Sequence, residues 1–285
     1  MLKPPIAACI CLCALCVAII GPVIAQQPHS PTTNAYYVAL GSSFAAGFGL
    51  GPPVPGSPAV SRRSSNGYPQ QLARLLQVTS FTDMTSSGST MAQVLHGGQE
   101  GLGPQVDALG PDTMLVTLTA GGNDIHYVGD LMKMAERQPG SGDGQPTHSL
   151  PSDVVRPATV QELAVLRTTF DETLHEIARR SPKARIVVVT YPLILPRTGT
   201  CLRLGLTDDE VDAMRTVGDR LAQVTRAAAL AANATVVDMA TLSAGHDACA
   251  VMPWVNGHNP KVGAPFHPTL AGAKATANAV AQAIQ

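Results

Sequence analysis

The stretch YVALGSSFAAGFG, residues 37–49, is the part of the sequence that decides the fold. A short, continuously apolar run ends at Gly41, and Ser42 and Ser43 follow at once. Gly41 permits a tight turn out of a strand, and Ala45 lets the next backbone pass closely, so the segment approximates the G-x-S-x-G elbow that exposes a nucleophilic serine. In this interpretation Ser43 projects and Ser42 supports the turn. The alternative is an ordinary turn from strand to loop.

Apolar strands and amphipathic helices alternate along the rest of the chain. The strands are continuously apolar, which is typical of a parallel sheet that helices cover on both faces. We therefore expect an α/β protein, a three-layer α/β/α sandwich with a parallel central sheet, formed as a single domain by residues 36–285. The expected strands are 36–40, 81–84, 113–120, 184–192 and 235–239, and the expected helices are 68–77, 159–180, 207–232 and 267–285.

The first 35 residues form a separate segment. Lys3 precedes a long apolar stretch, small residues flank a cleavage position after Ala25, and polar residues follow, so residues 1–25 are predicted to be a signal peptide. An uncleaved membrane anchor is the alternative. Residues 26–35 are predicted to be a linker. We expect a protein that is secreted or held in the cell envelope, with no stable membrane span after cleavage.

The composition of the chain limits which partners and cofactors we expect. The formal net charge is −1 and no basic stripe is present, so we expect no nucleic-acid partner. Four of the six cysteines lie in the predicted signal peptide, and Cys201 and Cys249 remain. In an exported chain these two most simply form one disulfide, and two separate buried thiols are the alternative. No cysteine spacing matches a metal site, and we expect neither a metal nor another cofactor.

Small and polar residues follow the strands at four places. They are Ser43 after the first strand, TSSGST at 85–90, GGND at 121–124, and PFHPT at 265–269 before the last helix. Ligands bind beyond the carboxyl ends of the strands in open parallel sheets, so these clusters can converge on one edge. Together they would supply a serine, backbone amides, an amide side chain and an imidazole, which are the parts needed for acyl transfer. Taken singly, each cluster is equally compatible with a turn or a helix cap.

The order and identity of these clusters resemble the SGNH (GDSL) hydrolase family, whose four blocks contribute Ser, Gly, Asn and His. Ser43, Gly88, Asn123 and His267 match those four positions. The resemblance covers residues 36–284 and looks closest to secreted actinobacterial lipases and esterases, through GHDAC at 245–249 and PWVNG at 253–257. It implies a flavodoxin-like sandwich, a nucleophile at Ser43 and a general base at His267. It also implies an oxyanion hole made by the backbone N–H groups of Ser43 and Gly88 and by Asn123 Nδ2.

The sequence departs from the family pattern at two positions. Ser42 stands where the family has an aspartate that shapes the turn, and Ala264 stands where it has an acid three residues before the histidine. Some family members resemble a dyad in which a backbone carbonyl orients the imidazole. We therefore expect the Ala264 carbonyl to face Nδ1 of His267, with Asp247 or Asp238 as the alternative.

These features predict a serine ester hydrolase, a lipase or esterase that acts on small-molecule or lipid esters as a monomer. A carbohydrate acetyl esterase of the same fold is one alternative, and a degenerate, non-catalytic envelope protein is another. The Gly- and Pro-rich segments 47–67 and 138–158 are predicted to be exposed loops, and the sequence does not indicate whether they act as lids.

Overall fold

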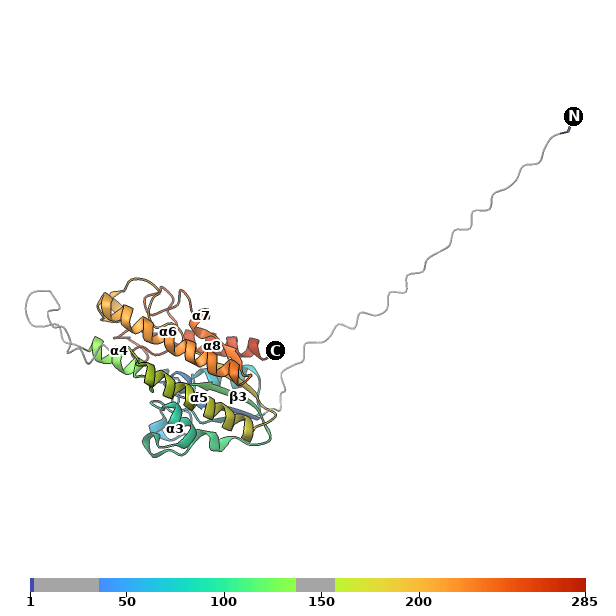
Figure 1. The fold of residues 1–285 in the computed structure, drawn as a ribbon, viewed down its shortest axis with the longest axis horizontal. Coiled ribbons are helices and arrows are strands. Elements are labelled where there is room, and N and C mark those ends of the chain that lie inside the picture. Colours follow the sequence, from blue (N-terminus) through green and yellow to red (C-terminus); the bar gives the residue numbers. More distant parts are fainter. Residues whose placement is uncertain (3–35, 137–156) are drawn as a thin grey trace, which may run out of the picture.

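The computed structural model describes residues 1–2, 36–136 and 157–285. Nearly all of the predicted signal peptide, the linker 26–35 and most of the predicted loop 138–158 therefore lie outside the described residues. The described domain begins at the first strand and ends with the last helix, as Figure 1 shows.

A five-stranded sheet forms the centre of the domain, and every strand pair in it is parallel. The strand order is β2-β1-β3-β4-β5, so the chain reverses its direction of winding between β1 and β3. In such sheets the ligand site lies at the carboxyl ends of these two strands. The strands are β1 (Tyr36–Gly41), β2 (Ser80–Asp83), β3 (Thr113–Thr119), β4 (Arg185–Val189) and β5 (Thr235–Val237). The prediction of a parallel α/β sheet is confirmed.

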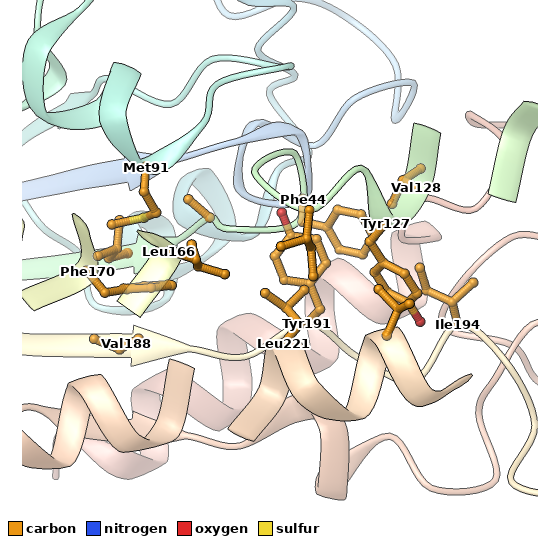
Figure 2. Packing of buried hydrophobic residues seen from close by; sticks show 14 of the residues in the cluster. Phe44, Met91, Tyr127, Val128, Leu166, Phe170, Val188, Tyr191, Ile194 and Leu221 are labelled. Atoms are coloured by element: carbon orange, nitrogen blue, oxygen red, sulfur yellow. The ribbon is translucent and has the colours of Figure 1, made fainter. Parts of the chain in front are cut away.

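Successive residues of the strands point to opposite faces of the sheet and into two separate cores. Val38 and Leu40 of β1 pack in the core beneath α5 (Val160–Arg180) and α6 (Asp208–Ala231). Their neighbours Tyr37 and Ala39 pack in the other core, beneath α2 (Tyr68–Leu75) and α8 (Leu270–Ala283). Figure 1 shows α5 and α6 side by side, and Figure 2 shows the first core in detail. The domain is therefore the three-layer sandwich that the strand pattern predicts.

The two long helices begin where the sequence predicts. Thr159 caps α5 and Thr207 caps α6, each by accepting from the backbone N–H of a glutamate three residues on. In both helices the glutamate side chain accepts in return from the cap residue's N–H, which completes a capping box. The strand predicted over 184–192 is shorter in the structure, where β4 ends at Val189. Pro192 has no backbone N–H to donate, so the strand does not continue through it.

The sequence pattern missed the short elements of the connections. A run of four to nine residues carries too few turns for a helical period to stand out. These elements are α1 (Ser43–Ala46), α3 (Met91–His96), α4 (Tyr127–Ala135), α7 (Met239–Leu242) and the 3₁₀ turns η1 (Ala59–Ser61), η2 (Gln99–Gly101), η3 (Gln105–Ala108) and η4 (Leu202–Leu204). Of these, α1 and α7 begin within two residues of the end of a strand, and α1 shapes the edge at which the predicted site lies.

Candidate active site

Ser43 stands at the turn between β1 and α1, where the chain leaves the sheet. Gly41 makes this turn possible, since its φ of 143° is one that side chains rarely allow. A Cβ at Gly41 would also lie 2.4 Å from the carbonyl oxygen of Thr119 on the neighbouring strand. The N–H of Ser42 donates to that same oxygen at 2.9 Å, which fixes the start of the turn. Ser43 follows in the first position of α1 and is 8% exposed.

The imidazole of His267 lies against the Ser43 hydroxyl. Its Nε2 is 2.8 Å from Ser43 Oγ, and His267 is only 5% exposed. Two hydrogen bonds, one between backbone groups and one to a side chain, hold the histidine loop in this position. The carbonyl of His267 accepts from Asn256 N–H at 2.9 Å, and Thr269 caps α8 by accepting from Gly272 N–H at 3.1 Å. The structure therefore brings together the two side chains that were predicted to be nucleophile and base.

The carbonyl that faces His267 Nδ1 belongs to Pro265, at 2.7 Å, and the expectation that it belongs to Ala264 is wrong. The Ala264 carbonyl is engaged elsewhere, because it accepts from His267 N–H at 3.3 Å and from Asn256 Nδ2 at 3.2 Å. The reason is the backbone at Phe266, whose φ of 55° folds the chain back on itself. This turn presents the Pro265 carbonyl, one residue later than expected, to the imidazole ring.

Neither of the two alternative carboxylates orients the imidazole. Asp247 Oδ1 accepts from Cys249 N–H at 2.9 Å and braces the disulfide loop. Asp238 accepts from Arg226 Nη1 at 3.1 Å and belongs to a cluster at the end of β5. Within the part of the chain that the structure describes, the Pro265 carbonyl is the partner of Nδ1 and Ser43 is the partner of Nε2. The pair has the arrangement of a serine–histidine dyad whose orienting group is neutral.

Burial lowers the pKa of His267 from 6.5 to about 4. The ring is enclosed by Phe44 and Phe48, whose centroids each lie 5.2 Å from its own, and desolvation disfavours the charged form. The hydrogen bond to the Pro265 carbonyl acts in the opposite direction, and its effect is smaller. His267 is therefore neutral at pH 7, with Nδ1–H donating to the carbonyl and Nε2 free to accept from the serine hydroxyl.

Gly88 is the exposed residue of an otherwise buried turn after β2, and its φ of 87° is a conformation that favours glycine. Gln99 lies directly behind this turn and donates from Nε2 to the Ser87 carbonyl at 2.9 Å. Within residues 36–136 and 157–285, the backbone N–H groups of Ser43 and Gly88 donate to no protein acceptor. Such groups are available to a ligand.

Asn123 follows β3 and contacts the same turn. Its Nδ2 donates to the Ser89 carbonyl at 2.9 Å, and because an amide nitrogen carries two hydrogens, one N–H remains available. The next residue, Asp124, accepts from Met91 N–H with both carboxylate oxygens, at 3.1 and 3.0 Å, and so caps α3. Burial raises the pKa of Asp124 to about 6. Both residues therefore attach the β3 loop to the turn that carries Gly88.

Gln105 joins the nucleophile turn to the Gly88 turn, and sequence reasoning missed it. Its Oε1 accepts from Gly41 N–H at 2.7 Å, while its Nε2 donates to the Gly41 carbonyl at 3.1 Å and to Ser89 Oγ at 3.2 Å. The residue is 4% exposed, so these three bonds are shielded from water. No motif or periodic pattern in the sequence marks this glutamine, since its partners lie 64 and 16 positions away.

Tyr191 supports Ser42, the residue that departs from the family pattern. The two hydroxyl oxygens lie 2.8 Å apart, and both groups are buried. Figure 2 shows the Tyr191 ring beside Phe44, with the centroids 4.2 Å apart. Burial raises the pKa of Tyr191 to about 12, so the phenol is neutral and can share its proton with Ser42. Tyr191, two residues after the end of β4, thus supplies the hydrogen-bond partner of the serine at this position.

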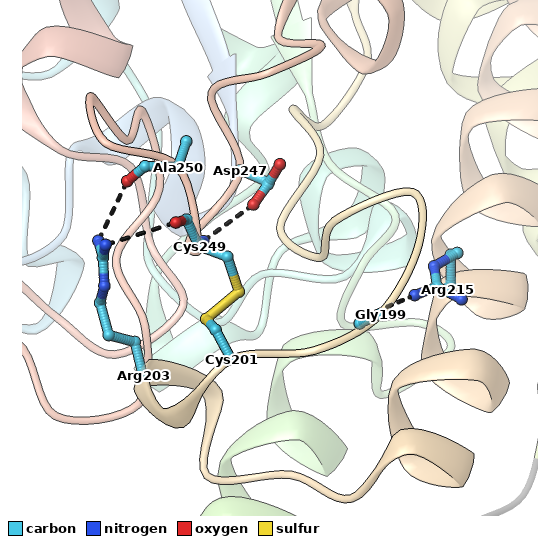
Figure 3. Close-up of a disulfide and its surroundings, with 7 residues drawn as sticks. All are labelled: Gly199, Cys201, Arg203, Arg215, Asp247, Cys249 and Ala250. Carbon is cyan, nitrogen blue, oxygen red and sulfur yellow. Dashed lines mark hydrogen bonds between the residues drawn. A yellow bond between two sulfur atoms is a disulfide. The ribbon is translucent and has the colours of Figure 1, made fainter.

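The predicted disulfide between Cys201 and Cys249 is present, with the two Cα atoms 5.9 Å apart. Arg203 braces the same loops by donating to the carbonyls of Ala250 and Cys249, as Figure 3 shows. The braced segment continues to Asn256, the residue that holds the histidine loop. The backbone from Cys249 to Asn256 thus links the disulfide to the loop that carries His267.

No group of three His, Cys, Asp or Glu side chains in the described residues is arranged to hold a metal ion. No helix among them is long and apolar enough to cross a membrane.

Comparisons with known proteins agree with this geometry. The model of the GDSL-like lipase/acylhydrolase family matches residues 39–275. Lipase 2 of Streptomyces coelicolor is 32% identical over 259 residues, which cover 86% of this chain and 84% of that protein. The crystal structure of an extracellular lipase from Streptomyces rimosus has a TM-score of 0.69 and 26% identity, over 87% of this chain and 99% of that one. Phospholipase A1 from Streptomyces albidoflavus NA297 has the same TM-score and the same coverage at 24% identity, which shows likeness of fold.

Proposed function

Because the chain belongs to the GDSL-like lipase/acylhydrolase family and is therefore an ester hydrolase, we propose that it cleaves carboxylic esters through an acyl-enzyme on Ser43. The observation that carries this proposal is the 2.8 Å contact between His267 Nε2 and Ser43 Oγ. An adjacent base is what converts a weakly nucleophilic serine hydroxyl into an attacking group.

In the acylation step, His267 accepts the Ser43 proton at Nε2 while Oγ attacks the ester carbonyl. The Pro265 carbonyl keeps the other ring proton on Nδ1, so the imidazole holds the tautomer that can accept. The negative charge that develops on the carbonyl oxygen favours the imidazolium in return, and it raises the pKa of His267 during the step. His267 then protonates the departing alcohol.

The tetrahedral oxyanion is stabilised by three N–H donors, from the backbones of Ser43 and Gly88 and from Asn123 Nδ2. This assignment is supported by the backbone N–H groups of Ser43 and Gly88, which donate to no protein acceptor among the described residues, and by the second N–H of Asn123 Nδ2. Donors that are already held in place need little reorganisation, and each contributes roughly 2.7–4 kcal/mol to lowering the barrier. In deacylation the same groups act again, with His267 taking a proton from the attacking water and returning it to Ser43.

We further propose that the substrates are lipid or small-molecule esters and that the enzyme acts outside the cell. The curated relatives are named lipases, and one relative of known structure is an extracellular lipase. The predicted signal peptide and the disulfide agree with an oxidising, extracellular environment.

A fluorophosphonate probe tests the proposed nucleophile. The wild type is expected to bind one probe per chain, and Ser43→Ala is expected to bind none. Ser42→Ala is the matched control, because it removes the neighbouring hydroxyl and leaves the nucleophile, so it should still be labelled. Labelling of Ser43→Ala, or a wild type that does not react, would contradict the proposal.

The substrate class needs a separate experiment. Hydrolysis of p-nitrophenyl esters of increasing chain length, measured beside release of acetate from acetylated xylan, separates a lipase or esterase from a carbohydrate acetyl esterase. We expect turnover of acyl esters longer than acetate and little release from the polysaccharide.

A further inference from the structure

A second pocket lies behind the turn that carries Gly88. Its volume is about 180 Å³, and its wall includes Arg63, Ser86, Gln93 and Gln99 and the apolar side chains of Met84 and Leu102. Ser89 and Gln105, which support the predicted active site, form another part of the wall, whereas Ser43 and His267 do not line the pocket. The pocket therefore adjoins the predicted active site without containing its nucleophile or its base. Pockets for drug-sized ligands measure roughly 300–1,000 Å³, so this one suits a small molecule.

The pocket contains a buried hydroxyl that has no partner. Ser86 is 1% exposed, and its Oγ makes no hydrogen bond within the described part of the chain. Buried polar side chains in folded proteins are nearly always hydrogen-bonded, so an orphaned hydroxyl in a pocket wall needs a partner from outside the chain, either a ligand or an ordered water. Nothing in the proposed reaction uses this hydroxyl.

Two further side chains of the wall, Arg63 and Gln93, carry unused donors. Arg63 donates from Nε to the Thr85 carbonyl, while its two Nη groups donate to no acceptor among the described residues. Gln93 uses Oε1 to accept from Thr90 N–H, which leaves both hydrogens of Nε2 free. A wall with a cationic fork, an amide N–H₂ and a hydroxyl complements a ligand that only accepts, and it fits best if that ligand is negatively charged.

The Asp83 carboxylate, which interacts electrostatically with Arg63, is occupied by protein donors. Asp83 does not line the pocket, and its oxygens accept from Gln70 Nε2 at 2.9 Å, from Thr85 N–H at 3.1 Å and from Thr85 Oγ1 at 2.6 Å. Arg63 makes no ion pair with it within 4.0 Å. The guanidinium is therefore available to an incoming anion.

We propose that this pocket binds a small carboxylate, with its oxygens between Arg63 and Ser86 and its short apolar end against Met84 and Leu102. The planar, bidentate carboxylate matches the fork of the Arg63 Nη groups. The inference concerns binding alone and does not depend on the reaction proposed for Ser43.

Calorimetric titration of the wild-type protein with sodium butyrate tests the proposal. One saturable site is expected, weakened about tenfold in Arg63→Gln and about fivefold in Ser86→Ala. Ser86→Ala is the safer variant, because the hydroxyl has no protein partner to lose and the fold should be unaffected. Arg74→Gln is the matched control, since Arg74 also donates to a backbone carbonyl, that of Ser65, but lies on the surface away from the pocket.

Binding at the predicted active site is separated by His267→Ala, which should leave the butyrate affinity unchanged because His267 does not line this pocket. Inorganic phosphate is the comparison probe, and it should bind more weakly because its tetrahedral shape does not match the pocket's apolar end. The proposal is overturned by an absence of saturable butyrate binding, by equal affinity in wild type, Arg63→Gln and Ser86→Ala, by loss of binding in His267→Ala, or by tighter binding of phosphate.

Discussion

His267 Nε2 and Ser43 Oγ lie 2.8 Å apart, although 224 positions separate the two residues in the chain. The sheet brings them together, because β1 delivers the serine to its carboxyl edge and the loop before α8 returns the histidine to the same edge. A backbone carbonyl, that of Pro265, stands behind the imidazole in place of a carboxylate.

The pH dependence of kcat/KM should reflect the buried imidazole. Only neutral His267 can accept the serine proton, so activity should fall as the pH drops through the pKa of about 4 rather than through 6.5. Phe48→Ala should admit water to the ring and move this acid limb to higher pH, whereas Leu75→Ala, an exposed apolar truncation, should not. An acid limb at or above 6.5 in the wild type would show that the imidazole is not desolvated in solution.

Removing the nearby carboxylates should leave catalysis nearly unchanged. In a serine–histidine–aspartate triad, loss of the carboxylate lowers kcat by about 10⁴. Asp247→Asn and Asp238→Asn should each keep kcat within about threefold of the wild type, because neither carboxylate contacts His267. The measurement is steady-state hydrolysis of a p-nitrophenyl ester. A fall of about a hundredfold or more in either variant would mean that an aspartate reaches the imidazole during turnover.

Asn123→Ala should lower kcat by roughly 10²–10³ while KM changes little, since an oxyanion donor acts mainly in the transition state. Asn123 also donates to the Ser89 carbonyl, so the fold of the variant should be checked by its unfolding curve. Asp124→Asn is a neighbouring control that keeps an acceptor for Met91 N–H. Full activity in a folded Asn123→Ala protein would exclude the side chain from the oxyanion hole.

Gln105→Leu should reduce both stability and activity. The substitution leaves the buried N–H and carbonyl of Gly41 without their side-chain partners, at a cost of about 1–3 kcal/mol for each group that stays unsatisfied. The turn that carries Ser43 would also lose its connection to Ser89, so kcat should fall more than KM rises. Urea unfolding and steady-state kinetics provide the two measurements.

The control for this variant is Gln161→Leu on the exposed surface of α5, which should change neither property. Gln105→Glu is informative as well, because it keeps the acceptor for Gly41 N–H and removes the donor. It should give an intermediate loss of stability. Wild-type stability in Gln105→Leu would mean that water or a neighbouring group replaces the amide.

The double variant Cys201→Ser/Cys249→Ser should unfold more easily. The disulfide closes a loop with a sequence separation of 48, for which the chain-entropy model gives about 4 kcal/mol. Dithiothreitol should destabilise the wild type by a similar amount and leave the double variant unchanged, which separates loss of the bond from effects of the serines. A loss below about 1 kcal/mol would show that Arg203 and the surrounding hydrogen bonds hold these loops without the bond.

The sequence by itself was sufficient for the parallel sheet, the two long helices and the cysteine pair. A continuous apolar run such as 184–192 predicts a buried strand. The caps at Thr159 and Thr207 are local signals, because each acts within four residues of the chain. The four small and polar clusters were also recognisable, because each follows a strand or precedes a helix. That the catalytic roles fall on Ser43, Gly88, Asn123 and His267 stays a prediction until the variants are measured.

The tertiary structure alone decided the supports of the site. The positive φ of Phe266 turns the Pro265 carbonyl, and not that of Ala264, toward the imidazole, and no residue type in the sequence signals that turn. Gln105 and Tyr191 bind groups on distant parts of the chain, at β1 and at the Gly88 turn, so no local pattern marks them. Periodicity and capping are short-range properties of a chain, whereas a hydrogen bond between distant segments exists only once the sheet has brought them together.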